Sequence, residues 1–153
     1  MPVHRIFISP TPGAPQVECE RVSVVAGKGI EGDRYFGLAD EPGRNLTLIE
    51  IEEVEAFIRE HHRSDDLSLT YRNILTQGVR LNELVGVDFY VGEVKVRGVE
   101  LCQPCLGMGE ALASDVLPAA AVVKHFVHRG GLRADVLSSG VIATGARIER
   151  ATA

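Results

Sequence analysis

Short runs in which apolar and polar residues alternate recur along most of the chain, and turn-forming residues interrupt them about every ten positions. The clearest runs span residues 87–91, 94–101 and 132–136. Alternation with a period of two is typical of strands that bury one face. Only residues 51–62 and 118–128 show helical spacing of apolar side chains. The pattern predicts a mainly β protein, a β-barrel or sandwich with helices laid on its outside.

Local signals predict where the two helices begin and end. Thr47 to Glu50 has the form of a capping box, so the first helix is expected to follow it and to end near residue 61 or 62. Pro118 suits the first turn of the second helix. Gly130 or Gly131 is expected to cap that helix. Two adjacent glycines exceed what a cap needs, so we also expect the backbone there to approach a ligand or another strand closely.

Length and charge restrict the function classes. The 153 residues fit one domain, residues 1–153, with enough chain for an ordinary core. The formal net charge of −5 argues against nucleic-acid binding, which needs a basic face. No apolar run is long enough to span a bilayer and the first residues carry no secretory pattern, so we expect no membrane association and a cytoplasmic protein. The three cysteines are therefore not expected to form a disulfide framework.

Cys102 and Cys105 lie in one stretch, separated by Gln103 and Pro104. Pro104 stiffens the backbone, so Cys105 is expected to leave the end of a strand on a fixed corner where its thiol can face a pocket. The C-x-x-C spacing is typical of a redox dithiol or of half a zinc site. The chain shows no βαβ unit of the kind that holds a redox dithiol, and no second pair of ligands that would complete a zinc site. Buried structural thiols are the alternative, which we favour for Cys102, whereas we favour a chemical role for Cys105.

Two further stretches combine basic side chains with unusual backbone. The glycine-rich loop 27–37 contains Arg34 and is interpreted either as a solvated turn or as an anion site built from backbone N–H groups and a guanidinium. Arg72 and Asn73 adjoin on a predicted strand, residues 70–78. Alternation would send them to opposite faces, so only one should line a pocket. Spacing alone favours an exposed arginine at a strand end.

Taken together and in order, these stretches resemble the MOSC domain, the C-terminal module of molybdenum-cofactor sulfurase. The resemblance covers nearly the whole chain. Its motifs are Gly29–Arg34, Leu46–Ile49, Arg72–Ile74 with Gly78, Leu81 with Leu84–Gly86, Cys102–Cys105, Gly130–Ala134, and Gly140–Ile142 with Gly145. The resemblance implies a closed or partly open β-barrel, similar to the barrel domain of pyruvate kinase, with two or three peripheral α-helices.

The resemblance also implies a chemistry. In the family the cysteine of the Pro-Cys step, here Cys105, is proposed to carry sulfur as a persulfide received from a pyridoxal-phosphate-dependent cysteine desulfurase. In amidoxime-reducing relatives the same cysteine is a ligand of molybdenum in the pterin cofactor. Cys105 is thus the predicted catalytic residue and metal ligand. The residues predicted to face the cofactor's phosphate or another anion are Arg34, Arg72, Asn73, Arg129, Gly130 and Gly131.

The predicted function is a sulfur-carrier or molybdenum-cofactor-binding domain that uses Cys105 as persulfide carrier or metal ligand in an anion pocket lined by arginine and glycine. Two alternatives stay open: a molybdenum-dependent reductase of N-hydroxylated compounds, and a non-catalytic module that binds a phosphorylated ligand and has structural thiols. Whether the chain is an enzyme, a sulfurtransferase or an oxidoreductase, is left open too. The expected partners are a cysteine desulfurase and a sulfur acceptor, and pyridoxal phosphate is expected only in that desulfurase.

Overall fold

The computed structural model describes residues 2–11, 15–37, 43, 45–61, 70–102, 113 and 118–151. Within these segments eleven strands form an eight-stranded sheet and a three-stranded sheet. The strands are β1 (Val3–Ile8), β2 (Val17–Cys19), β3 (Arg21–Val25), β4 (Gly29–Ile30), β5 (Leu46–Glu50), β6 (Ile74–Thr76), β7 (Asp88–Val91), β8 (Val94–Leu101), β9 (Leu132–Val136), β10 (Gly140–Ala143) and β11 (Ile148–Arg150). The described helices are α1 (Ile51–His61), α3 (Ala119–His125) and the 3-10 helix η2 (Leu81–Leu84).

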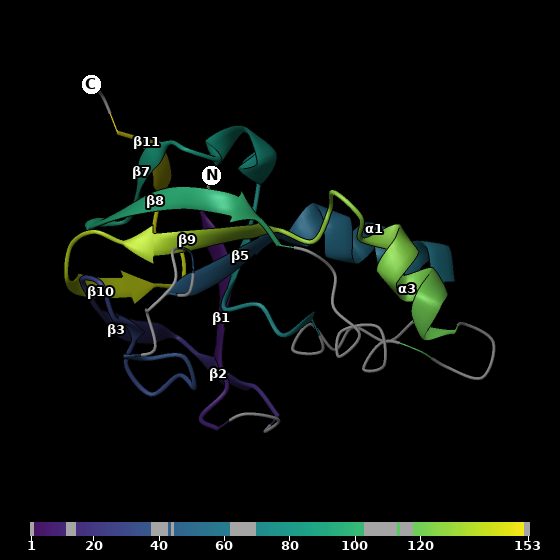
Figure 1. Cartoon of the computed structure of the whole chain (residues 1–153), viewed down its shortest axis with the longest axis horizontal. Helices are drawn as coiled ribbons and strands as arrows, with labels where there is room; N and C mark the ends of the chain where they lie inside the picture. The colour runs from purple at the N-terminus through teal and green to yellow at the C-terminus, as the bar shows by residue number, and fades with distance from the viewer. Residues whose placement is uncertain are drawn as a thin grey trace.

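The sheets curl into a partly closed barrel. The larger sheet has the order β11-β7-β8-β9-β5-β6-β1-β2, in which only the pair β5–β6 is parallel, and the smaller has the order β10-β3-β4. The start of β1 contacts the turn before β11, where Val3 N donates to Ala146 O at 2.8 Å and Gly145 N donates to Val3 O at 2.8 Å. These bonds join distant strands of the sheet, so its strands surround a common interior (Figure 1).

Two apolar clusters hold this arrangement together. The larger fills the barrel interior, and the smaller joins the sheet to the two α-helices. Neighbouring residues on three adjacent strands point to different clusters, so β1, β5 and β6 are buried on both faces. The pairs are Ile6 and Phe7, Leu48 and Ile49, and Ile74 and Leu75. Burying such a side chain contributes about 1.5–3 kcal/mol, which explains the continuous apolar runs on these strands.

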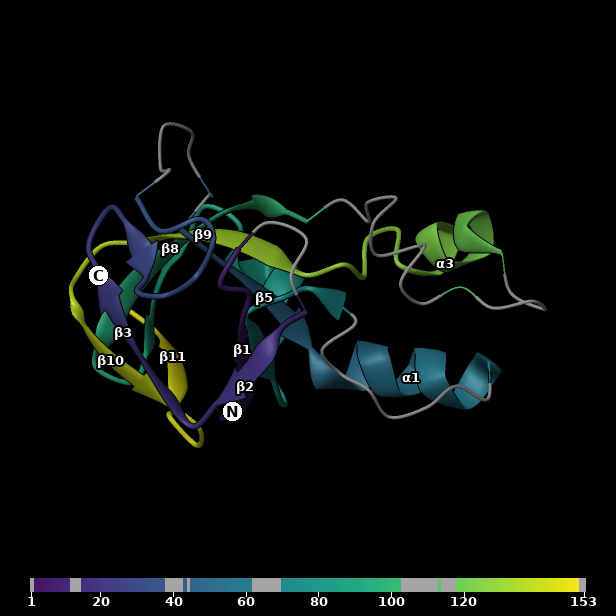
Figure 2. The same ribbon diagram turned by 90° about the horizontal axis from the view of Figure 1, so that it is seen from below.

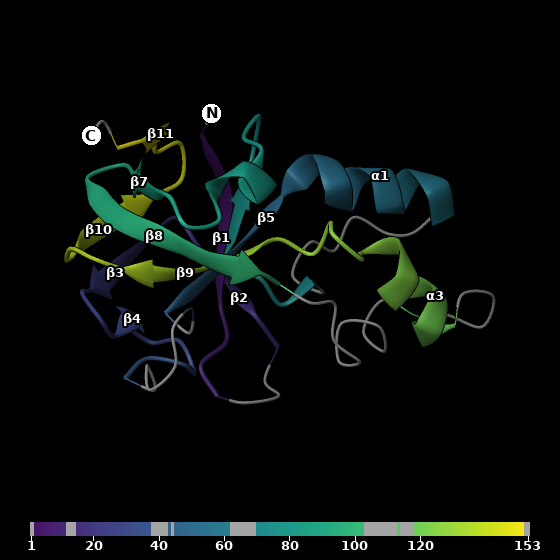
Figure 3. The same ribbon diagram turned by 45° about the horizontal axis from the view of Figure 1, so that its top comes forward.

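The helices lie together beyond one end of the barrel (Figures 2 and 3). Phe57 of α1 packs against Phe126 just after α3, with ring centroids 5.2 Å apart. The predicted fold class is confirmed, since the protein is mainly β, its sheet forms a partly closed barrel and its helices are peripheral. No helix in the described segments combines the length and the apolarity that crossing a membrane requires.

Two predicted helix ends were wrong. Thr47 does not cap a helix, because β5 continues to Glu50 and α1 follows directly at Ile51. The second helix ends at His125 with Phe126 at its C-cap, so Gly130 and Gly131 do not cap it. The left-handed residue after this helix is His128, with φ of +61°.

The strands depart from simple alternation at two places, and one strand is shorter than predicted. The alternation breaks at Glu20, where the chain leaves β2 in the larger sheet for β3 in the smaller. The register between β8 and β9 shifts between Gly98 and Glu100. The strand predicted over residues 70–78 covers only Ile74–Thr76, so Arg72 and Asn73 precede it.

Candidate functional site

The predicted reactive thiol, Cys105, lies outside the described residues. The structure does describe Cys102, which follows the end of β8 and is 4% exposed. Cys102 N donates to Gly131 O at 2.8 Å, so the last described residue of this stretch is attached to the loop that enters β9. The candidate site is therefore built from the residues around this attachment.

Arg72 is the buried cation of the site. The residue is 6% exposed. Its Nε donates to Gly130 O at 2.8 Å and its Nη1 to Thr70 O at 3.4 Å. Its Nη2 is buried and has no hydrogen-bond partner within the described structure. The expectation of an exposed arginine was therefore wrong, because two backbone carbonyls hold this side chain inside.

Arg72 and Asn73 are both buried, which strand alternation did not predict. The two residues precede β6, and Tyr71 before them has a left-handed φ of +57°. The period of two holds only within a strand. Outside β6 the backbone is free to turn both side chains inward.

At Gly130 and Gly131 the backbone closely approaches two other segments, β5 and the end of β8 at Cys102, as we expected from two adjacent glycines. Gly131 has φ of +100°, and a Cβ there would overlap the carbonyl of Leu48 on β5. A Cβ on Gly130 would stand 2.8 Å from Cys102 O and 3.6 Å from Nη2 of Arg72. The space beside the unpartnered nitrogen thus depends on Gly130 having no side chain.

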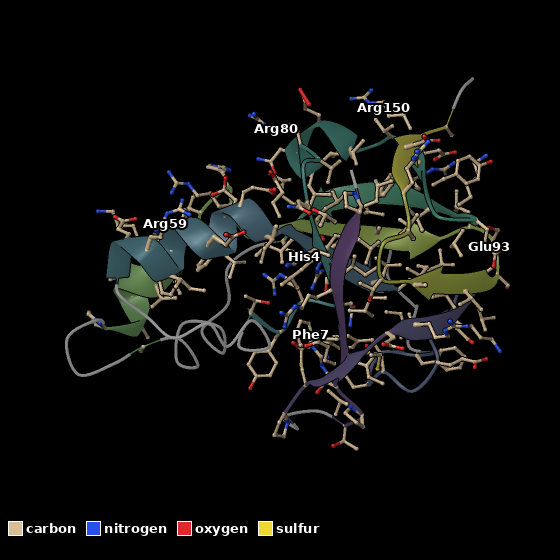
Figure 4. All side chains as sticks on the ribbon, turned by 180° about the vertical axis from the view of Figure 1, so that it is seen from behind. His4, Phe7, Arg59, Arg80, Glu93 and Arg150 are labelled. Carbon is tan, nitrogen blue, oxygen red and sulfur yellow. The ribbon has the colours of Figure 1, made fainter. Side chains whose placement is uncertain are left out.

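Asn73 connects this region to two strands. Its Oδ1 accepts bonds from Thr47 N at 3.1 Å and from Thr47 Oγ1 at 3.2 Å. Its Nδ2 donates to Phe7 O at 3.1 Å and to Asp33 Oδ1 at 3.4 Å. Phe7 is labelled on β1 in Figure 4. Thr47, interpreted from the sequence as a helix cap, instead uses its hydroxyl within this network.

Asp33 is the residue of the site that sequence reasoning missed. It is 5% exposed, and its Oδ1 also accepts bonds from Ser9 N at 3.0 Å and from Arg34 Nη1 at 3.4 Å. The Arg34 guanidinium lies over the Tyr35 ring, with 4.3 Å from Cζ to the ring centroid. The only signal in the sequence was the position of this carboxyl between a glycine and an arginine.

The structure brings together five of the predicted anion-binding residues but not the sixth. Arg72, Gly130 and Gly131 meet at Cys102, and Asn73 with Asp33 links them to Arg34. Arg129 points elsewhere, because its half-exposed guanidinium lies 3.8 Å from Glu53 of α1.

A cavity of about 400 Å³ has His128, from the segment that follows α3, in its lining. Its lining residues are Glu50, Glu52, Glu53, Gly78, Val79, Arg80, Asn82, Glu83 and His128. Burial first, and then the Glu53 carboxylate, raise the pKa of Glu50 above its usual value. The four glutamates give this lining a net negative charge, which repels anions, and the lining includes none of the residues that meet at Arg72. Among the described residues, no group of three or more His, Cys, Asp or Glu could hold a metal ion.

A family model of the MOSC domain matches residues 37–149 of the chain. Among solved structures, the YUAD protein from Bacillus subtilis superposes with a TM-score of 0.85 at 21% identity, covering 99% of this chain and 96% of that one. YiiM from Geobacillus stearothermophilus gives 0.75 at 16% identity, covering 98% and 74%. YiiM from Escherichia coli gives 0.69 at 18% identity, covering 100% and 71%. A comparison with curated proteins gave no match.

Proposed function

The chain belongs to the MOSC domain family, and from that premise we propose that it carries sulfur on Cys105 beside an anion site centred on Arg72. The proposal rests on one observation, the buried Nη2 of Arg72 that has no partner among the described residues. A buried guanidinium that lacks a counter-charge costs several kcal/mol, and an unpaired buried donor costs about 1–3 kcal/mol. A bound anion removes both costs, so this nitrogen supports an anion-binding role.

The position of Arg72 supports a connection to the thiol. Cys102 is held at Gly130 and Gly131, next to the Arg72 guanidinium. Cys105 follows three residues later, and three residues span at most about 11 Å. A cation at that range favours the thiolate over the thiol, and the thiolate is the nucleophile in sulfur exchange.

The sulfur transfer itself is an exchange between two sulfur carriers. The Cys105 thiolate attacks the outer sulfur of a persulfide on a cysteine desulfurase. A sulfur–sulfur bond forms at Cys105, the bond within the donor persulfide breaks, and the donor leaves as a thiolate. A second exchange passes the sulfur to an acceptor. Pyridoxal phosphate acts only in the partner, where it releases sulfur from cysteine.

The family also implies the molybdenum cofactor, whose phosphate is an anion. The unpartnered nitrogen of Arg72 and the space left by Gly130 fit such a group, and both would hold it. When bound, the cofactor would supply a redox-active metal for which a cysteine thiolate is a suitable soft ligand. The chain's own part is to bind the anion, orient it at Arg72 and present Cys105.

The test is mass spectrometry of the protein after incubation with a cysteine desulfurase and cysteine. We expect one added sulfur on the peptide that contains Cys105, and none on that peptide in Cys105→Ser. Cys19→Ser is the matched thiol control, because the Cys19 thiol lies on β2, where it contacts Val17 O, and should not alter loading. Sulfur bound to the Cys105→Ser protein at the wild-type level would contradict the proposal.

A second pair of variants tests the role of Arg72. Arg72→Gln should slow sulfur loading, whereas Arg97→Gln should not, because Arg97 is an exposed arginine that binds Asp88 on the surface of the sheet. Equal loading of both variants would leave Cys105 as a carrier without the proposed cation. A non-catalytic phosphate-binding module would show the opposite pattern, with anion binding at Arg72 and no loading of Cys105.

A further inference from the structure

The two arginines of the site have different electrostatic surroundings. Arg34 has a carboxylate partner, since its Nη1 lies 3.4 Å from Asp33 Oδ1, and the two side chains are 13% and 1% exposed. Arg72 has no carboxylate partner in the part of the chain that the structure describes, and its Nε and Nη1 bind backbone carbonyls. The three groups together carry one net positive charge, which is located at Arg72.

We propose that Asp33 sets the charge balance of the anion site, because its carboxylate neutralises Arg34 and leaves Arg72 as the group that meets the anion. This inference rests on the proposed anion site at Arg72. It gives Arg34, which sequence reasoning assigned to anion binding, a supporting role.

The contacts of Arg34 show why it is held in place. Its backbone N donates to Ser9 O at 2.8 Å, its guanidinium lies over the Tyr35 ring, and Asp33 binds its Nη1. Asp33 Oδ2 accepts a further bond from Tyr35 N at 3.4 Å. A guanidinium that is held by a carboxylate and by the face of an aromatic ring is already neutralised and oriented. It therefore offers an incoming anion little additional attraction.

Asn73 links Asp33 to Arg72. Its amide donates to Asp33 Oδ1, and Arg72 is its neighbour in the chain. The Asp33 carboxylate is therefore connected to Arg72 through one hydrogen bond and one peptide unit. At low salt, where screening extends over about 30 Å at 0.01 M, its charge acts on an anion bound at Arg72. Its negative charge limits the affinity of the site for anions, and removing that charge should raise the affinity.

The two possible roles of Asp33 predict opposite signs. A purely structural carboxylate would disturb the site when lost, so Asp33→Asn would bind an anion more weakly. A carboxylate that sets the charge balance makes Asp33→Asn bind the anion more tightly, because the Arg34 charge is then uncompensated. Arg34→Gln should bind more weakly, because it leaves the Asp33 charge uncompensated, and the double variant should return close to wild type.

The experiment measures inorganic phosphate binding by titration calorimetry at low salt, using full-length protein. We expect Asp33→Asn to bind about fivefold more tightly and Arg34→Gln about fivefold more weakly, changes of the size that one unit charge causes through the intermediate dielectric near a protein surface. The double variant should lie within about twofold of wild type. Added salt should weaken phosphate binding to Asp33→Asn more steeply than to wild type, a change that a structural role would not cause.

Three results would overturn the inference. Weaker binding by Asp33→Asn with a normal urea-unfolding curve would make Asp33 structural, while the anion site would stand. A double variant that loses more than tenfold would make Arg34 a direct ligand, and this arm decides the matter if Asp33→Asn alone does not fold. Equal phosphate binding by wild type and Arg72→Gln would overturn the anion site itself, and with it this inference.

Discussion

Replacing Asn73 with alanine should destabilise the fold more than any other single polar deletion at the site. The residue is 3% exposed and its amide makes four hydrogen bonds, to Thr47 N, Thr47 Oγ1, Phe7 O and Asp33 Oδ1. Alanine removes the partner of two backbone groups, the partly buried N–H of Thr47 and the buried carbonyl of Phe7. Each group left unpaired costs about 1–3 kcal/mol. We therefore expect the free energy of unfolding to fall by about 4 kcal/mol.

Urea unfolding followed by circular dichroism measures this loss, with Asn82→Ala as the matched control. Asn82 is an exposed asparagine whose amide donates one bond, to His128 O at 3.0 Å. Its replacement should change stability by less than about 1 kcal/mol. In thermal unfolding, Asn73→Ala should lower the midpoint by about 10 °C for a chain of this size. A loss below about 1 kcal/mol in Asn73→Ala would refute the argument that this amide joins β1 to β5.

Two further substitutions test the backbone and the acidic cavity. Gly131→Ala should lower the free energy of unfolding in urea by at least about 3 kcal/mol, because its φ is left-handed and a Cβ would strike a strand carbonyl. Gly86→Ala is the control, with φ of +76° and open space around it, and should lower it by only about 1 kcal/mol. Equal losses in the two variants would contradict this reasoning. Burial and Glu53 raise the pKa of Glu50 above its value in the unfolded chain, so wild type loses stability as the pH rises from the unfolded to the folded pKa of this carboxyl. Glu50→Gln should therefore be more stable than wild type at pH 7. The difference should disappear below about pH 4, where the carboxyl is protonated in both states, and parallel stability curves from pH 4 to 7 would contradict it.

Much of the fold could be predicted from the sequence because strand alternation is a local signal. The runs 94–101 and 132–136 form strands as the pattern placed them, and the run 87–91 does so from Asp88 on. The capping-box motif at Thr47 is a local signal too, but it gave a wrong prediction. The Thr47 hydroxyl instead bonds Asn73, which lies 26 residues away in the sequence. Tertiary contacts of this kind override local propensity.

The candidate site was less predictable for the same reason. Arg72 looked like an exposed strand end, and only the carbonyl of Gly130, 58 residues later, shows why it is buried. Asp33 attracted no attention because its partners, Ser9 and Asn73, are distant in the sequence. The close approach at Gly130 and Gly131 was predictable, since two adjacent glycines exceed the needs of a helix end.

The most direct test of the central claim is a crystal structure of the protein soaked in tungstate, an oxyanion that anomalous scattering locates. We predict a peak within hydrogen-bonding distance, about 3 Å, of Arg72 Nη2, and its loss in Arg72→Gln. Tungstate bound only at other surfaces, or a protein carboxylate paired with Nη2, would contradict the claim that this buried guanidinium awaits an anion.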